Sequence, residues 1–175
     1  AIDPLSGHGM FEAIGSALAA APVVNTLIKR PQDATPARQY FQERAEQSFL
    51  RHCRVGRDFY TQERRWSTRP FWRERQQWPD DKPAHLPPLD SPPRIEQRPV
   101  IENDFIVLKE VVVTAHHPRG VWQVAGIPLI PLQRFLQSRT ASIELAARHF
   151  EQAPENAATA AEWLRFRGLL PTNSR

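Results

Sequence analysis

The stretch with the clearest chemical potential runs from Arg51 to Trp78, where eight arginines stand among three acidic residues. Aromatic residues interrupt the arginines at Phe59, Tyr60, Trp66, Phe71, Trp72 and Trp78. Guanidinium groups bind phosphate oxygens in pairs, and flat aromatic rings stack on bases. The stretch therefore predicts a surface for single-stranded or looped nucleic acid. Its predicted contact residues are Arg57, Arg64, Arg65, Arg69, Arg73, Arg75, Trp66 and Trp72.

A second interpretation of this stretch is structural. Aromatic side chains can anchor an irregular segment onto a core while the arginines stay in solvent, with cation–π contacts between the two kinds of side chain. The positive charge then needs no ligand. Both interpretations are consistent with the composition, and both stay open.

The sequence contains no comparable pattern that indicates catalysis or metal binding. No nucleophile–base pair, phosphate-cradling glycine loop, HExxH motif or usefully spaced pair of carboxylates stands out. Cys53 is the only cysteine, so neither an intrachain disulfide nor a cysteine-based zinc site can form. His116 and His117 are adjacent, and adjacent side chains diverge on a strand or turn. The sequence therefore predicts a protein that is not an enzyme, with no catalytic residue, metal or cofactor.

The composition of the whole chain indicates one ordinary domain with a long extended part. The 175 residues include 17 prolines against 7 glycines. The formal charge of +4 comes almost entirely from arginine, which favours a polyanion or an acidic protein surface as partner. An arginine bias that merely reflects genomic base composition is the alternative. The single cysteine indicates a reducing compartment, so we expect a cytoplasmic protein.

The N-terminal region, residues 10–78, is expected to be helical. Residues 1–9, before Met10, are interpreted as a leader added for expression. Apolar residues at three- and four-residue intervals then predict a short helix that Pro22 ends. This break leaves the run shorter than a membrane span, so no transmembrane segment is expected, and a signal peptide over 11–21 is the alternative. The residues of the apolar stripe are Phe11, Ile14, Leu18 and Ala21.

A second helix is predicted behind Thr35 as N-cap, with Pro36 in its first turn and its end at about Val55, before Gly56. Prolines then recur through residues 79–99 without a periodic apolar pattern. This composition is typical of a linker or of a strap that crosses a surface. It divides residues 10–78 from a C-terminal domain over residues 100–175.

The C-terminal domain is expected to begin with a β-hairpin. Phe105–Thr114 is β-branched and apolar, His116–Gly120 has turn chemistry, and Val121–Ala125 is extended again, which predicts a hairpin over about 105–125. Within it, Glu110–Ala115 resembles the TonB box of outer-membrane receptors, which adds as a strand to a partner. Edge-strand pairing is therefore a further alternative.

Three short helices are predicted after the hairpin, over about 132–138, 142–150 and 155–170. Ser142 is the N-cap candidate of the second helix, and Gly168 closes the third. The predicted fold class is therefore α+β and mainly helical. Its parts are a β-hairpin, a C-terminal three-helix bundle with a helix-turn-helix rhythm, and a long proline-rich irregular segment.

The C-terminal helices carry a resemblance to a known kind of module. Residues 142–150 followed by 157–170 resemble the helix-turn-helix of winged-helix regulators, and residues 126–132 resemble the entry strand of antitoxin-type proteins that accompany PIN-like toxins. The resemblance implies that the second helix of the motif reads bases in the major groove. The implied contacts are Asn156 and Thr159 with bases, and Arg148, Arg165 and Arg167 with phosphates.

The same helices also fit a plain packing or dimerisation unit, because Glu155 and Glu162 would repel phosphate. Two function hypotheses therefore result. The first is a non-enzymatic nucleic-acid-binding protein, a regulator or antitoxin-like protein that binds DNA or RNA. The second is a protein-interaction or assembly component of a larger bacterial or phage complex, which wraps a protein partner or another copy of itself with its apolar helix, aromatic residues and proline-rich strap.

Overall fold

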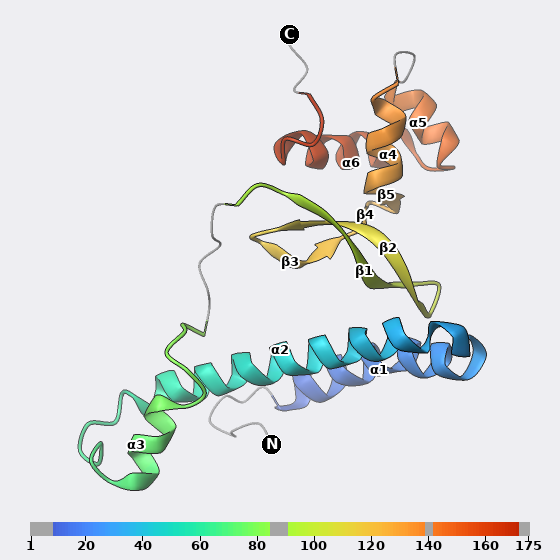
Figure 1. The fold of residues 1–175 in the computed structure, drawn as a ribbon. Helices are drawn as coiled ribbons and strands as arrows, with labels where there is room; N and C mark the ends of the chain where they lie inside the picture. Colours follow the sequence, from blue (N-terminus) through green and yellow to red (C-terminus); the bar gives the residue numbers. More distant parts are fainter. Residues whose placement is uncertain (1–8, 85–90, 139–141, 172–175) are drawn as a thin grey trace. The chain divides into compact units, whose positions relative to one another are not determined.

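A computed structural model of the protein describes residues 9–84, 91–138 and 142–171 (Figure 1). The fold is α+β and mainly helical, which confirms the predicted fold class. In chain order the elements are α1 (Gly9–Lys29), the 3-10 helix η2 (Pro31–Asp33), α2 (Ala34–Tyr60), α3 (Pro70–Gln77), β1 (Arg94–Glu102), β2 (Phe105–Thr114), β3 (His117–Val121), β4 (Gln123–Val124), β5 (Ile127–Pro128), α4 (Leu129–Leu136), α5 (Ile143–His149) and α6 (Pro154–Phe166).

The chain forms two compact units. Unit 1 contains Ala1–Pro87 and Ile101–Val107, and unit 2 contains Pro88–Val100 and Leu108–Arg175. The tip of the hairpin between β1 and β2 thus belongs to the same unit as the N-terminal helices. The predicted division into 10–78, 79–99 and 100–175 stays a prediction. The predicted leader lies outside the described residues except for Gly9, where α1 begins.

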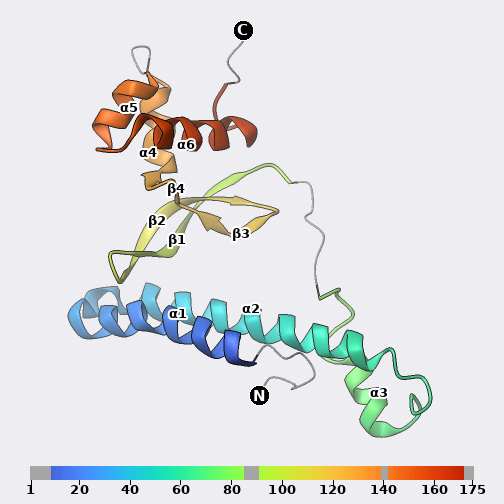
Figure 2. The same cartoon turned by 180° about the vertical axis from the view of Figure 1, so that it is seen from behind.

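The two long helices of unit 1 run antiparallel and side by side (Figures 1 and 2). The prediction that Pro22 ends the first helix is wrong, because α1 continues to Lys29 with Pro22 inside it. A proline within a helix costs about 3 kcal/mol, so contacts made beyond it must offset that loss. Val23 and Thr26, on the next turn, are both buried and supply such contacts.

The second helix also differs from its prediction at both ends. It begins at Ala34 with Asp33 as N-cap, two residues before the predicted cap Thr35, and it continues through Gly56 to Tyr60. Glycine weakens a helix by roughly 0.5–1 kcal/mol, which a long neighbouring helix can compensate. The longer α2 brings Arg57 to Tyr60 into regular structure beside α3.

The core of unit 1 is small and lies where the helices meet the hairpin tip. Val23, Ala37 and Ile106 form it, with Leu27 and Tyr40 packed against it. At its centre the buried Thr26 hydroxyl donates to the Pro22 carbonyl at 2.7 Å and accepts from the Ile106 amide at 2.8 Å. The Thr26 hydroxyl, the Pro22 carbonyl and the Ile106 amide therefore each have a hydrogen-bond partner within the protein.

The strands form a three-stranded sheet in the order β1-β2-β3 and a separate two-stranded pair of β4 and β5. A hairpin within 105–125 is confirmed, since β2 pairs with β3 in antiparallel register with Thr114 opposite His117. Its predicted turn at His116–Gly120 is wrong, because the chain turns at Ala115 and His116 and residues 117–121 already form β3. Strand β1 was not predicted and starts inside the proline-rich stretch. It turns into β2 through Asn103 and Asp104, whose φ values of 48° and 64° suit a two-residue hairpin turn.

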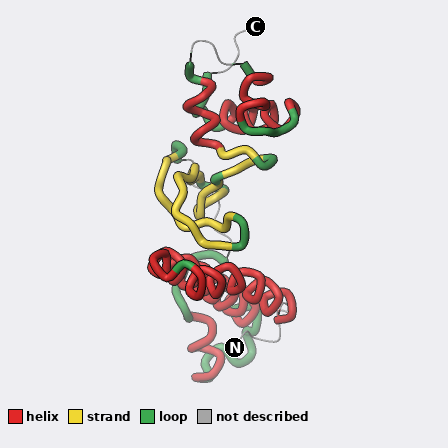
Figure 3. The backbone as a smooth tube through the Cα atoms, turned by 90° about the vertical axis from the view of Figure 1, so that its right-hand side faces the viewer, coloured by secondary structure: helices red, strands yellow, loops and turns green. Residues whose placement is uncertain are grey.

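Unit 2 is built around three helices that gather near the C-terminal end (Figure 3). Helix α4 begins three residues before its predicted start, and α5 begins after Ser142, as predicted. The Ser142 hydroxyl caps α5 by accepting from the Leu145 amide at 3.2 Å. After α6, Gly168 has a φ of 72° and the Leu169 amide donates to the Leu164 carbonyl at 2.9 Å, which confirms the predicted helix stop.

Candidate functional site

The arginine-rich and aromatic stretch folds as the end of α2, a connection over 61–69, and α3. Tyr60, Phe71 and Trp72 pack edge to face, with ring centroids 5.5–6.3 Å apart. Arg75 lies over the Phe71 ring, with its guanidinium carbon 3.7 Å from the centroid. Part of the stretch therefore holds α3 against α2, as the structural interpretation expects.

Two arginines of this stretch are used inside unit 1. Arg54 makes a two-point ion pair with Asp80, at 2.9 and 2.6 Å, so the chain after α3 is tied back to α2. Arg57 is 8% exposed, pairs with Asp58 and donates to the Asp80 carbonyl. Its prediction as a nucleic-acid contact is wrong, because its guanidinium is buried and hydrogen-bonded.

The ion pair of Arg54 and Asp80 changes the acidity of both groups. The hydrogen bond from Arg54 lowers the pKa of Asp80 from 3.8 to about 2. The same hydrogen bond raises the pKa of Arg54. The pair therefore stays ionised under all ordinary conditions. This contact was not predicted from the sequence, although Asp80 and Asp81 directly after the arginine-rich stretch are a source of negative charge.

The other arginines around α3 face solvent. Arg65 pairs with Glu63 at 2.8 Å, and its side-chain and backbone hydrogen bonds lower the pKa of Glu63. Arg64, Arg69 and Arg73 are exposed and have no carboxylate partner among the described residues. Exposed aromatic side chains accompany them. We define the α3 surface as Arg64, Arg65, Arg69, Arg73, Arg75, Trp66 and Phe71.

The α3 surface differs from the predicted contact set in three residues. Arg57 is buried, and Trp72 is half-buried in the packing against Tyr60. Phe71, which was not in the predicted set, is 50% exposed. The exposed fraction of Phe71 depends on how much of its ring Tyr60 and Trp72 cover. The sequence does not show which side of α3 packs against them.

The predicted contacts of the C-terminal helices lie in unit 2. Asn156 donates to Gln152 at 3.3 Å, and Thr159 donates to the carbonyl of Glu155 at 2.8 Å, so both polar side chains are engaged with their own helix end. Arg167 lies 5.4 Å from the Trp163 ring and 5.3 Å from the Phe166 ring. Arg148 is exposed, and Arg165 is half-buried.

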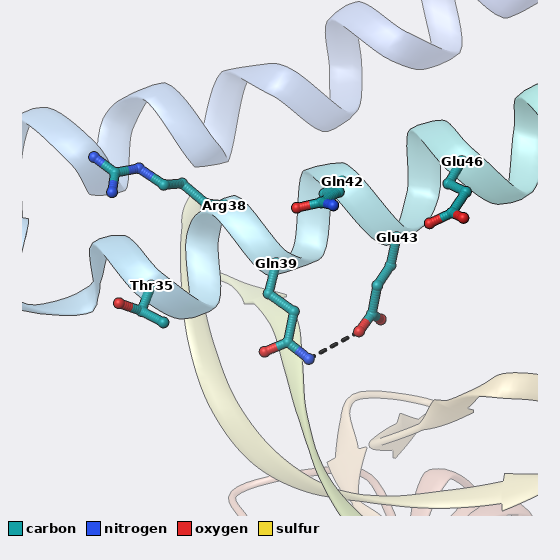
Figure 4. Close-up of a pocket in the computed structure, with 6 residues that line it drawn as sticks. All are labelled: Thr35, Arg38, Gln39, Gln42, Glu43 and Glu46. Carbon is teal, nitrogen blue, oxygen red and sulfur yellow. Dashed lines mark hydrogen bonds between the residues drawn. The ribbon is translucent and has the colours of Figure 1, made fainter.

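A surface hollow of about 410 Å³ lies along α2 (Figure 4). Its lining residues have polar side chains, and one hydrogen bond of 2.8 Å joins Gln39 to Glu43 along the helix. All of its lining residues belong to one helix, so it lacks the converging walls that hold a small molecule. The lining residues are Thr35, Arg38, Gln39, Gln42, Glu43 and Glu46.

Titratable groups outside these clusters do not converge on one point. Within the described ranges, no three His, Cys, Asp or Glu residues lie close enough together to hold a metal ion. Burial raises the pKa of the Cys53 thiol, which favours its protonated form. Burial and the nearby charge of Arg167 lower the pKa of His117.

Comparison with solved structures places this fold beside that of an enzyme that acts on tryptophan side chains within polypeptides. The similar protein is the peptidyl tryptophan dihydroxylase QhpG, which is essential for tryptophylquinone cofactor biogenesis. The two share 44% sequence identity with a TM-score of 0.70. The match covers 97% of this chain and 39% of QhpG, so the chain spans about two-fifths of that enzyme's length. No protein family and no curated protein matches the sequence.

This similarity corrects the functional predictions. The prediction of a non-enzymatic protein is wrong, whether as a nucleic-acid-binding regulator or antitoxin or as an assembly component, because the similar structure is an enzyme of cofactor biogenesis. The physical reason is that guanidinium groups pair with carboxylates as readily as with phosphates, so arginine content does not select nucleic acid. The resemblance to a winged-helix module, a protein partner or homo-oligomer, and a cytoplasmic location stay predictions.

Proposed function

We propose that this chain is part of an enzyme that hydroxylates tryptophan side chains in a polypeptide, and that its α3 surface binds the polypeptide substrate. The supporting observation is the 44% identity with QhpG over 97% of this chain. Similarity at this level over nearly the whole chain includes both units. The proposed role of this chain is therefore a part of the activity that the name of QhpG describes.

The chemistry of the α3 surface suits an acidic polypeptide. Arg64, Arg69 and Arg73 are exposed guanidinium groups that have no carboxylate partner among the described residues. Arginine pairs with a carboxylate through two parallel hydrogen bonds, which fixes the orientation of the bound group as well as its position. Trp66 and Phe71, 46% and 50% exposed, offer flat apolar faces between these charges. A segment with acidic and aromatic side chains complements this surface.

The arrangement also favours rapid capture of such a substrate. Clustered charge of one sign steers a partner of opposite charge and raises the association rate more than the final affinity. The ion pair of Arg54 with Asp80 and the packing of Tyr60 on Phe71 and Trp72 hold α3 in place before the substrate arrives. A surface that is ordered in advance loses less entropy on binding.

We assign the oxidation of the indole ring to a portion of the enzyme that corresponds to the part of QhpG outside the match. QhpG extends well beyond the shared region, since the match covers 39% of its length. This chain then contributes substrate binding and support for that portion. The division predicts separable effects: changes on the α3 surface alter substrate binding, while the chemical step continues.

The test uses the intact enzyme and the unmodified polypeptide that acquires tryptophylquinone in the source organism. The variant Arg64→Ala/Arg69→Ala/Arg73→Ala is expected to raise KM about tenfold with kcat unchanged, because three exposed ion pairs of at most about 1 kcal/mol each are lost. The control Arg38→Ala/Arg119→Ala/Arg148→Ala removes the same charge from other exposed positions and should leave KM unchanged. Equal KM values for both triple variants would reject the assignment of the α3 surface.

A further inference from the structure

Helix α1 carries its large apolar side chains on the side that faces solvent. They recur at helical spacing along the 21 residues of the helix. We define the outer α1 face as Met10, Phe11, Ile14, Leu18, Val24 and Ile28, which are 76%, 77%, 55%, 70%, 50% and 73% exposed. A helix that merely packs on its own domain shows the opposite arrangement, with its large apolar residues buried.

The buried side of α1 consists of small or short side chains. Ala19, Pro22, Val23 and Thr26 are buried there. Polar contacts with α2 fix this orientation: the Ser48 hydroxyl donates to Glu12, and Arg44 donates to the Gly15 carbonyl at 3.5 Å. Rotating the helix to bury its outer face would break these contacts and expose Thr26. The outward direction of the large side chains is therefore built into unit 1.

The outer α1 face is large enough to form an interface. A helix of 21 residues extends roughly 30 Å at 1.5 Å per residue. A buried aromatic side chain covers about 150–250 Å² and the aliphatic ones less, so these six side chains at half to three-quarters exposure together present on the order of several hundred Å². One partner in a standard protein interface buries about 800 Å². Glu12 and Lys29 are the charged residues of α1, and Glu12 faces α2.

We infer that the outer α1 face is the docking surface for the oxidising portion of the enzyme, which must offer a complementary apolar surface. This inference rests on the proposed function. QhpG, which matches 97% of this chain, has most of its length outside the match, and a corresponding portion would supply this occupant. On this inference, the outer α1 face is covered by the portion that corresponds to the rest of QhpG.

A lipid bilayer fits the outer α1 face less well. By length and composition α1 could cross a membrane, yet it lies along α2, which carries many charged residues. Insertion would either strip α1 from its contacts with Ser48 and Arg44 or take charged groups into hydrocarbon. A second copy of the chain could cover the outer α1 face with an apolar surface of the same kind. The experiment must therefore distinguish a second copy from the oxidising portion.

Thiol labelling in the intact enzyme tests the docking surface without relying on activity. Cys53 is first replaced by alanine, and one cysteine is placed at Leu18 or, as a control, at Phe166, which is 81% exposed in unit 2. Docking predicts that a maleimide reacts with L18C about tenfold more slowly than with F166C, at all protein concentrations and without lipid. A photoreactive group on L18C should cross-link to a peptide of the oxidising portion.

Three outcomes would overturn the inference. Equal labelling rates at both positions would show that the outer face is free. Protection of L18C that disappears on dilution, with cross-links to the same residues of a second copy, would indicate self-association. Protection that requires anionic phospholipid vesicles would indicate a membrane. Tryptophan hydroxylation by the unlabelled enzyme is assayed in parallel, so cross-linking without hydroxylation would reject the proposed function and leave the docking surface intact.

Discussion

The two units of this chain bury their apolar residues in opposite ways. In unit 2, α4 and α6, of 8 and 13 residues, direct Leu129, Ile130, Leu132 and Leu164 into a common core, where none is more than 1% exposed. The 7-residue α5 adds Ala146 and Ala147 to this core. In unit 1, the two longest helices bury mainly small residues such as Ala19 and Ala37. Short helices are stable only when tertiary packing supports them, so unit 2 depends on its core. The large apolar side chains of the outer α1 face, in contrast, are exposed.

This difference suggests that the two units have different roles. Unit 2 has the continuous core of a self-supporting body, whereas unit 1 presents an apolar face on α1 and the α3 surface. An apolar face and a charged surface in one unit suit two kinds of partner, one held permanently and one bound transiently. Substitutions that separate stability from binding can sharpen this comparison.

The largest expected effect is on the core of unit 2. Leu164→Ala should lower the free energy of unfolding by about 2–5 kcal/mol, because the fully buried leucine leaves a cavity. Urea denaturation of the intact enzyme measures this loss as a shift of the unit 2 transition. Phe166→Ala, two residues away on the same helix and 81% exposed, should change it by less than about 0.5 kcal/mol. Similar losses for both variants would contradict the description of the unit 2 core.

A smaller loss is expected at the polar centre of unit 1. Thr26→Val removes the hydroxyl that accepts from the Ile106 amide and leaves that buried donor without a partner. The expected cost is about 1–3 kcal/mol, measured by denaturation with a probe in unit 1. Thr26→Ser keeps the hydroxyl and should recover most of the loss. If Thr26→Val and Thr26→Ser were equally unstable, the hydrogen bond would not be the cause.

The cap of α5 should contribute about as much as a typical helix cap. Ser142→Ala removes the acceptor of the Leu145 amide and should cost about 1 kcal/mol. Ser142→Asp keeps an acceptor and should remain near the stability of the original protein. The unit 2 transition in urea measures both variants. A neutral Ser142→Ala would mean that water satisfies the Leu145 amide equally well.

The smallest effect is the pH dependence of the ion pair that holds the segment after α3. The pKa of Asp80 falls from 3.8 to about 2 on folding, so its carboxylate stabilises the folded state above about pH 4. That contribution is lost as the pH falls through about 2. Asp80→Asn should therefore lower the melting temperature by a few degrees at pH 7, and the difference should shrink toward zero near pH 2. Asp81→Asn is the control, and equal effects of both variants would exclude the pair with Arg54.

The sequence predicted those elements whose local pattern agrees with their final packing. The β-branched run from Phe105 to Thr114 forms the predicted strand, and Ser142 caps the predicted helix. The turn at Asn103 and Asp104 was a signal for β1 that the neighbouring prolines obscured. The prediction that Pro22 and Gly56 end helices was wrong, because packing of α1 against α2 outweighs the local preference.

The sequence predicted most residues of the α3 surface, but the function predicted for the protein was wrong. The sequence located the exposed arginines and Trp66, but it could not show that Arg57 is buried by Asp58 and Asp80. The identity of the ligand depends on which anion the arginines meet, and guanidinium chemistry is the same for phosphate and carboxylate. The proposal of a polypeptide ligand therefore rests on the similarity to QhpG and not on the residue types alone.

Mass spectrometry of the substrate polypeptide after incubation with the intact enzyme is the most direct test of the central claim. The account predicts that a tryptophan side chain of that polypeptide gains two oxygen atoms, and that Arg64→Ala/Arg69→Ala/Arg73→Ala slows this gain at low substrate concentration but not at saturation. A substrate polypeptide whose tryptophans remain unmodified, under conditions in which QhpG modifies its own substrate, would contradict the account.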